Sequence, residues 1–85
     1  MWPNPWDLFR RMTITLDARN LKCPLPVLRA RKAMKEVAAG GLLKVLATDP
    51  GAPQDFVHFC RATGHELVES TESDGVFSLV IRKSA

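Results

Sequence analysis

The spacing of hydrophobic residues changes along this chain, and the order of those spacings limits the folds that the chain can adopt. Ile14 and Leu16 alternate with polar residues at a period of two, which predicts a strand with one buried face. From residue 24 to residue 39 the spacing becomes helical, and a Gly-Gly pair at residues 40–41 ends the predicted helix. The apolar face of this helix is predicted to consist of Val27, Ala30, Met34, Val37 and Ala38.

The second half of the chain repeats this pattern and then adds a pair of strands. Residues 42–48 are a second apolar run, and a strand–helix–strand unit of this length favours a parallel right-handed crossover. A second helix follows, with Pro53 suited to its first position, Asp55 to its first turn and Gly64 to its end. Its inner stripe is predicted to be Phe56, Phe59, Cys60 and Thr63. The last two predicted strands, joined by a turn across residues 73–75, are residues 67–71 and 76–82.

The order βαβαββ predicts an α/β fold, a two-layer sandwich in which two helices cover one face of a four-stranded mixed sheet. The length of 85 residues allows one such domain, which we expect over residues 12–85. Residues 1–11 combine Trp2, Trp6 and Phe9 with two prolines, a mixture that suits neither a helix nor a central strand. We expect an extended aromatic arm there, either loosely ordered, packed on the open face of the sheet, or bound to a partner.

The composition is that of a globular protein which folds without a disulfide framework. Hydrophobic residues make up 46% of the chain and charged residues 25%, and the two cysteines are far apart in sequence. The sequence contains neither an apolar run long enough to span a membrane nor the pattern of a secretory signal. A cytoplasmic location without membrane association is therefore expected. The net charge of +3 permits anionic partners but does not require them.

The sequence Cys23-Pro24-Leu25-Pro26 marks the start of the first helix. A residue before proline is disfavoured in the helical region, so we expect Cys23 at the N-cap, with Pro24 in the first and Pro26 in the third helical position. The amide of Leu25 is then the available donor to the cysteine side chain, and the positive end of the helix dipole favours a sulfur anion. The arrangement predicts a reactive thiolate, and the alternative is an inert, small apolar cap.

The segment Leu16-Asp17-Ala18-Arg19-Asn20-Leu21-Lys22-Cys23-Pro24-Leu25-Pro26 resembles the signature of the TusA (SirA-like) sulfur-carrier family. The resemblance extends through Asp49-Pro50, Phe59-Cys60 and Gly64-His65-Glu66-Leu67 to the final strand. It implies a βαβαββ sandwich and a transient persulfide on Cys23, with no other cofactor. It also implies a sulfurtransferase that acts as a covalent sulfur carrier rather than a turnover enzyme.

The resemblance further implies that the carrier relays sulfur between two proteins. The donor would be a cysteine desulfurase or a rhodanese, and the acceptor a protein of tRNA thiolation or sulfur metabolism. We expect a monomer, because the thiol must be presented to successive partners. Asn20 stands where the family commonly has glycine, although asparagine tolerates a left-handed turn. The aromatic arm also lies outside the family pattern.

Basic side chains form one arc of the first helix around an exposed leucine. That leucine is Leu28, and the cations are Arg29, Arg31, Lys32 and Lys35. A solvated helix face and a docking patch for a partner protein are both consistent with this arc. A regulatory or nucleic-acid-binding module that uses the basic face is the alternative function, although the strands lack the exposed aromatic pairs that stack on bases.

Other chemically active residue types have structural explanations. Cys60 lies on the apolar stripe of the second helix and is expected to pack there rather than act as a resolving thiol. His58 lies nearly opposite Cys60 on that helix, and no set of ligands has the spacing of a metal site. Asp49, before Pro-Gly, is expected to form a turn, and Asp17 to order the loop before the reactive cysteine.

Overall fold

Six elements follow one another in the predicted order βαβαββ in the computed structural model, which describes residues 13–84. They are β1 (Thr13–Ala18), α2 (Leu25–Met34), β2 (Leu42–Ala47), α3 (Ala52–Thr63), β3 (Glu66–Ser73) and β4 (Val76–Arg82). The aromatic arm predicted over residues 1–11 lies outside the described residues. No helix within residues 13–84 is long and apolar enough to cross a membrane.

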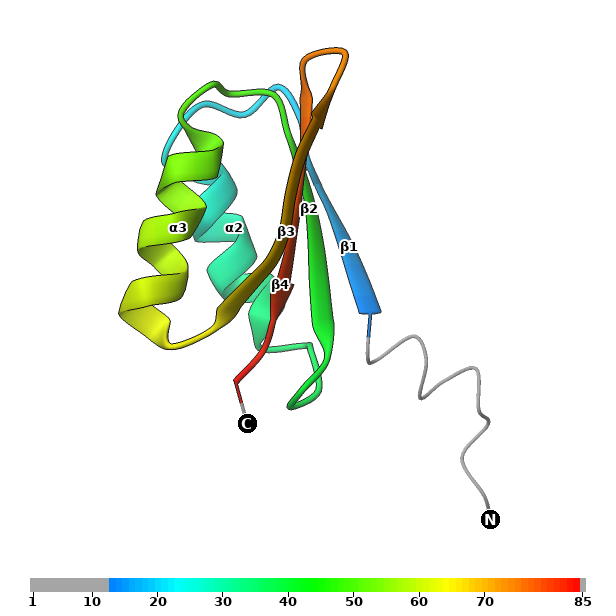
Figure 1. The fold of residues 1–85 in the computed structure, drawn as a ribbon, viewed down its shortest axis with the longest axis vertical. Helices are drawn as coiled ribbons and strands as arrows, with labels where there is room; N and C mark the ends of the chain where they lie inside the picture. The colour runs from blue at the N-terminus through cyan, green and yellow to red at the C-terminus, as the bar shows by residue number, and fades with distance from the viewer. Residues whose placement is uncertain (1–12, 85) are drawn as a thin grey trace.

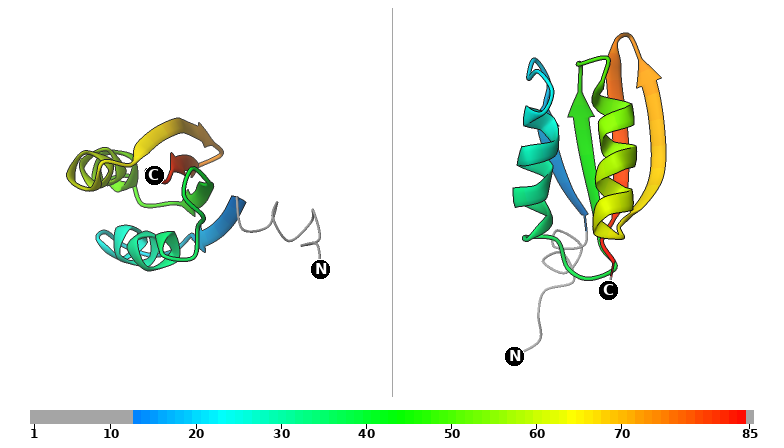
Figure 2. Two further views of the ribbon diagram at one scale, coloured as in Figure 1. Left: turned by 90° about the horizontal axis from the view of Figure 1, so that it is seen from below. Right: turned by 90° about the vertical axis from the view of Figure 1, so that its left-hand side faces the viewer.

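The four strands form one mixed sheet in the order β1-β2-β4-β3. β1 and β2 are parallel, with Thr13 opposite Leu42 and Ala18 opposite Ala47. β4 is antiparallel to both of its neighbours, β2 and β3. Both helices lie on the same side of the sheet, so the molecule has one helical layer and one sheet layer (Figures 1 and 2). The predicted two-layer sandwich is confirmed.

The core lies between the helices and the facing side of the sheet. Alternate residues of the two central strands are fully buried there, including Val45 of β2 and Leu79 of β4, which are direct partners. The helices contribute the other large buried side chains, chiefly Phe56 and Phe59 of α3. The period of two in the strands and the helical spacing in α2 and α3 therefore meet in a single apolar layer.

α2 ends five residues earlier than the hydrophobic spacing predicts. The amide of Glu36 donates to Ala33 and that of Val37 to Met34, so the chain tightens into turns after the helix. Val37 is buried as predicted, whereas Ala38 is exposed and does not belong to the inner face. The hydrophobic spacing extends past the end of α2 because Val37, in the turns after the helix, is still buried in the core.

One side chain of α3 and one end of β3 also differ from the prediction, whereas the turn between β3 and β4 agrees with it. Thr63, predicted on the inner stripe of α3, is exposed, and its hydroxyl donates to the carbonyl of Phe59 at 2.7 Å. β3 extends to Ser73, where Asp74 and Gly75 form a two-residue turn with φ of 52° and 80°. Positive φ at both positions is typical of the type I′ turns that join hairpin strands.

Replacing Val45 by alanine should lower the free energy of unfolding by about 2 kcal/mol, because it leaves a cavity in the buried layer. Val80→Ala is the matched control. Val80 is paired with the exposed Lys44 on the face of the sheet away from the helices (Figure 1) and is only half-buried, so its loss should cost less than about 1 kcal/mol. Urea denaturation followed by circular dichroism measures both. Equal effects of the two substitutions would contradict the assignment of the buried face.

Candidate functional site

The candidate site lies at the edge of the sheet where the parallel strands β1 and β2 end. Because these strands run in the same direction, the loops that leave them arrive together at this edge, and α2 and α3 both begin there (Figure 1). Cys23 precedes the N-cap residue of α2, Pro24, and Asp55 lies in the first turn of α3. The topology thus brings together two side chains that are 32 positions apart in sequence.

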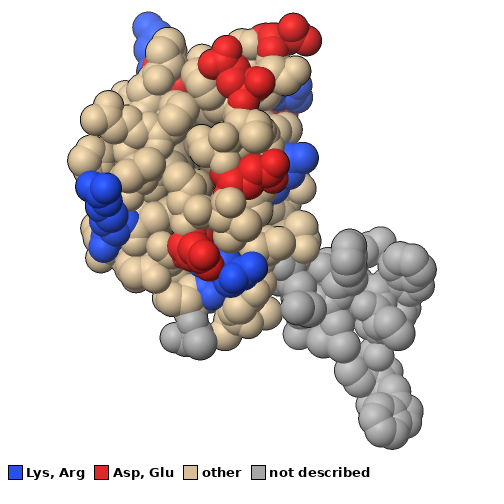
Figure 3. All heavy atoms as spheres, viewed as in Figure 1, with Lys and Arg blue, Asp and Glu red and all other residues tan. Residues whose placement is uncertain are grey.

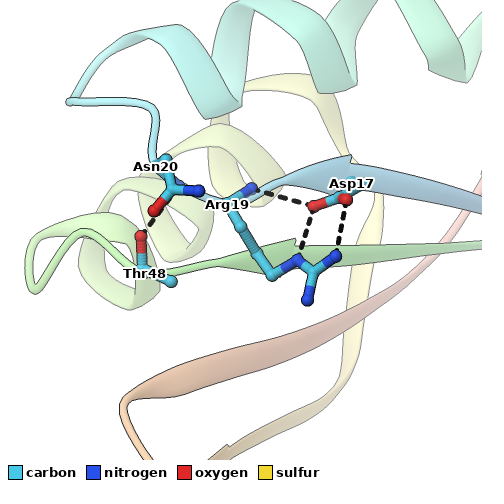
Figure 4. Close-up of polar contacts among 4 residues, drawn as sticks. All are labelled: Asp17, Arg19, Asn20 and Thr48. Carbon is cyan, nitrogen blue, oxygen red and sulfur yellow. Dashed lines mark hydrogen bonds and ion pairs between the residues drawn. The ribbon is translucent and has the colours of Figure 1, made fainter.

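The loop before Cys23 is ordered by a local contact between Asp17 and Arg19 and by a contact from Asn20 to Thr48, just after β2 (Figure 4). Asp17 accepts hydrogen bonds from the backbone amide of Arg19 at 3.1 Å and from its guanidinium at 2.9 Å, and these contacts lower the pKa of Asp17 to about 2. Asn20 adopts φ of 66°, and its amide donates to the hydroxyl of Thr48 at 2.9 Å. The predicted structural role of Asp17 and the left-handed turn at Asn20 are confirmed.

The helix start differs from the prediction by one residue. α2 begins at Leu25, with Pro24 at the N-cap, and no side chain caps the helix. The amide of Leu25 donates to the carbonyl of Lys22 at 2.8 Å, so it is not available to Cys23. The prediction that Cys23 is the N-cap and binds the Leu25 amide is therefore wrong, because a turn from residue 22 to residue 25 satisfies that amide first. Pro26 is buried against the core.

The Cys23 thiol is exposed and donates a hydrogen bond to the carboxylate of Asp55. This hydrogen bond is the main cause of a raised pKa at Cys23, and desolvation and the negative charges of Asp55 and Asp49 act in the same direction. The prediction that the helix start favours a sulfur anion at Cys23 is therefore wrong for the free protein, because the pKa of the thiol is raised. Sequence reasoning placed Asp55 correctly in the helix but missed it as a site residue. The predicted parallel pairing of the first two strands was the signal that could have found it.

Cys23 opens into a groove between α2 and α3, which we call the Cys23 groove. Its volume is about 290 Å³, and its other lining residues are Pro24, Val27, Arg31, Asp55, His58, Phe59 and Ala62. The guanidinium carbon of Arg31 lies 6.0 Å from the centre of the Phe59 ring, a distance at which a cation is attracted to an aromatic face. Of the predicted docking cations, Arg31 is the one that lines this groove.

The remaining predicted docking residues lie on the exposed surface of α2. Leu28 is 54% exposed, and Leu25, three residues earlier, is 44% exposed, so the two form a small apolar surface beside Cys23. Leu25 was predicted only as part of the helix start. Arg29 and Lys32 line a depression on the side facing β1, whereas Lys35 lies on the side facing α3. The basic arc therefore extends across α2, with the two leucines within it.

Cys60 is buried beside Phe56 and Phe59, and this burial raises its thiol pKa. It does not line the Cys23 groove, as expected of a packing residue. His58 is exposed. Asp49 accepts a hydrogen bond from the Gly51 amide at 3.0 Å, which confirms its predicted role in the turn. Within residues 13–84, no group of three or more His, Cys, Asp or Glu side chains is arranged to hold a metal ion.

Comparison with known proteins identifies the family. The family described as "Sulfurtransferase TusA" matches residues 14–83. The chain belongs to the TusA family. A relative from Neisseria meningitidis is 59% identical over 68 residues, which are 80% of this chain and 92% of the relative. The sulfur carrier protein TusA of Allochromatium vinosum is 51% identical over 69 residues, which are 81% of this chain and 91% of that protein.

A solved structure supports the same assignment. The SirA-like protein from Desulfitobacterium hafniense superposes with a TM-score of 0.74 at 35% identity, over 85% of this chain and 99% of that one. The shared fold is the α/β sandwich with an open four-stranded sheet described above. Membership of the TusA family supports a role as a sulfur carrier, and such a role implies contact with proteins that supply and receive sulfur.

Mild alkylation should separate the two cysteines. Cys23 is exposed and Cys60 is buried, so iodoacetamide should modify Cys23 in the folded protein and Cys60 only after unfolding in urea. Mass spectrometry of proteolytic peptides, with and without denaturant, measures the modification of each cysteine. Modification of Cys60 first, under native conditions, would contradict the burial described here.

Proposed function

We propose that this protein holds a sulfane sulfur as a persulfide on Cys23 and relays it from a donor protein to an acceptor protein. The observation that supports this most directly is the position of Cys23, an exposed thiol at the start of α2 in a chain of the TusA family. The proposed donor is a cysteine desulfurase or a rhodanese, and the acceptor a protein of tRNA thiolation or sulfur metabolism. The proposed location is the cytoplasm, and no cofactor other than the persulfide is needed.

The proposed transfer consists of two displacements at sulfur. In the first, the Cys23 thiolate attacks the outer sulfur of a persulfide on the donor, and the donor's S–S bond breaks with its electron pair leaving on the donor thiolate. In the second, a thiolate of the acceptor attacks the outer sulfur now bound to Cys23, which is released as a thiolate. The sulfur atom keeps its oxidation level throughout, so no oxidant is required. Both steps need access to Cys23, which its exposed position provides.

The proposed docking surface consists of Leu25 and Leu28 together with the cations of α2. A partner that covers Cys23 would also cover these two leucines, which lie within the next turn and a half of the helix. β3 lies at the other edge of the sheet from β1 (Figure 2) and has exposed carboxylates, of which Glu66 is paired with Arg82 while Glu69 and Glu72 form no ion pair within residues 13–84. Figure 3 shows acidic side chains on this side of the molecule. This distribution favours a partner with an acidic contact surface and orients that partner toward α2. The carrier is proposed to act as a monomer.

Incubation with a cysteine desulfurase and cysteine, or with a rhodanese and thiosulfate, should add one sulfur atom to Cys23. Cys23→Ser should abolish this addition, since a hydroxyl is a poor nucleophile toward a persulfide, and Cys60→Ala should retain it. Intact-mass and peptide mass spectrometry measure the addition. Absence of the added sulfur with both donors, or its loss in Cys60→Ala alone, would contradict the proposal.

Leu28→Asp should slow loading by a protein donor roughly tenfold at low carrier concentration, because it places a charge in the apolar centre of the docking surface. Val68→Asp is the matched control, since Val68 is an exposed apolar residue of β3, at 44% exposure, on the opposite edge. Initial rates of persulfide formation measure both variants, and the rate of Cys23 alkylation in each corrects for a direct effect of the new charge on the thiol. Equal slowing in the two variants would place the docking surface elsewhere.

A further inference from the structure

Asp55 has an unusual position for an acidic residue at a helix start. It is half-buried on the wall of the Cys23 groove, and the hydrogen bond from the Cys23 thiol is its one side-chain hydrogen bond within residues 13–84. The ion pairs of the described chain join Asp17 to Arg19 and Glu66 to Arg82, so none of the described cations neutralises Asp55. Its carboxylate is therefore directed at the nucleophilic sulfur without a cation to balance its charge.

The contact between Asp55 and Cys23 requires a proton on the sulfur. A carboxylate accepts hydrogen bonds, so the thiol must be the donor, and ionisation of the thiol would place two negative charges in contact. Arg31 of α2 and His58 of α3 line the same groove, Asp49 of the loop after β2 acts on the sulfur through its charge, and Lys22 precedes Cys23 in the chain. Neither Arg31 nor His58 hydrogen bonds to the sulfur or to Asp55, and Asp49 adds further negative charge.

We propose, on the basis of the sulfur-carrier function above, that Asp55 is a positioning residue that keeps the Cys23 thiol protonated in the free carrier and releases it when a partner protein pairs a Lys or Arg side chain with the carboxylate. The released thiol then ionises and attacks the outer sulfur of the donor persulfide. Its proton ends on the donor's leaving thiolate, so the proton, the sulfur atom and the electron pair are balanced.

The physical consequence is a thiol that is exposed but weakly reactive until a partner docks. The thiolate is the nucleophilic form, so a protonated Cys23 reacts slowly with free electrophiles and oxidants even though solvent reaches it. The groove beside the contact is open, which leaves room for a cationic side chain to approach Asp55. This site therefore favours a partner protein whose reactive cysteine has a Lys or Arg side chain close enough to pair with Asp55.

The pH dependence of alkylation by iodoacetamide, a neutral reagent, tests the role of Asp55 independently of sulfur transfer. In Asp55→Asn, the midpoint of the profile should fall by about one pH unit or more, because the negative charge on the acceptor is gone. Asp55→Glu keeps the charge and should restore most of the wild-type midpoint. Asp74→Asn, at the tip of the β3–β4 hairpin, makes the same change in net charge far from Cys23 and should match the wild type.

An unchanged or raised midpoint in Asp55→Asn, or an equal shift in Asp74→Asn, would overturn the proposal. Circular dichroism of each variant measures whether the fold is retained, and Asp55→Ser, which also removes the negative charge and should lower the midpoint, replaces the asparagine variant if that variant is unstable.

Loading by a cysteine desulfurase at the same pH tests the release. If the partner neutralises Asp55, the variant Asp55→Asn should be alkylated several-fold faster than the wild type. Its rate of persulfide loading should be equal to that of the wild type or lower. An equal increase in both rates would overturn release by the partner. Failure of loading in the wild type, combined with the predicted alkylation shift, would contradict the carrier function and leave the protonation role of Asp55 supported. Normal loading of the wild type, without the predicted alkylation shift in Asp55→Asn, would support the carrier function and overturn the protonation role of Asp55.

Discussion

The parallel pairing of β1 with β2 is the constraint on which the rest of the structure depends. Antiparallel strands can be joined by a tight turn, but parallel strands need a crossover, and α2 supplies it here. The same pairing makes both strands end at one edge of the sheet, so α2 and α3 begin side by side. Cys23 and Asp55 meet because each belongs to the start of one of these helices. The site is therefore a product of the topology.

Two electrostatic effects oppose each other at Cys23. The N-terminus of α2 has a partial positive charge of about half a unit, which favours a thiolate. Asp55 has a full negative charge in direct hydrogen-bond contact with the sulfur, and Asp49 adds a second carboxylate nearby. The Asp55 carboxylate accepts the hydrogen bond of the thiol directly, so the carboxylates prevail and the thiol pKa is raised. The proposed action of a partner reverses this balance, which would couple the reactivity of the thiol to docking.

The two faces of α2 have separate roles in the proposed relay. Its inner face, represented by Ala30 and Met34, is buried and fixes the helix on the sheet. Its outer face presents Leu25 and Leu28 among cations, and the side toward α3 places Arg31 in the Cys23 groove. The rigid inner contact means that the thiol and the docking surface are held in one geometry, so a partner that recognises the leucines also meets the sulfur.

The sequence by itself determined the order of elements, the inner face of β1, the turns at Gly64 and Asp74-Gly75, and Cys23 as the candidate thiol. These features depend on local periodicity and on backbone conformations that few residue types allow. The hydrogen bond from Leu25 to Lys22 is also local, but hydrophobic spacing does not distinguish this turn from an N-cap at Cys23. The tertiary structure alone decided that Asp55 accepts from Cys23, because these residues are distant in sequence and meet only through the parallel pairing of β1 with β2.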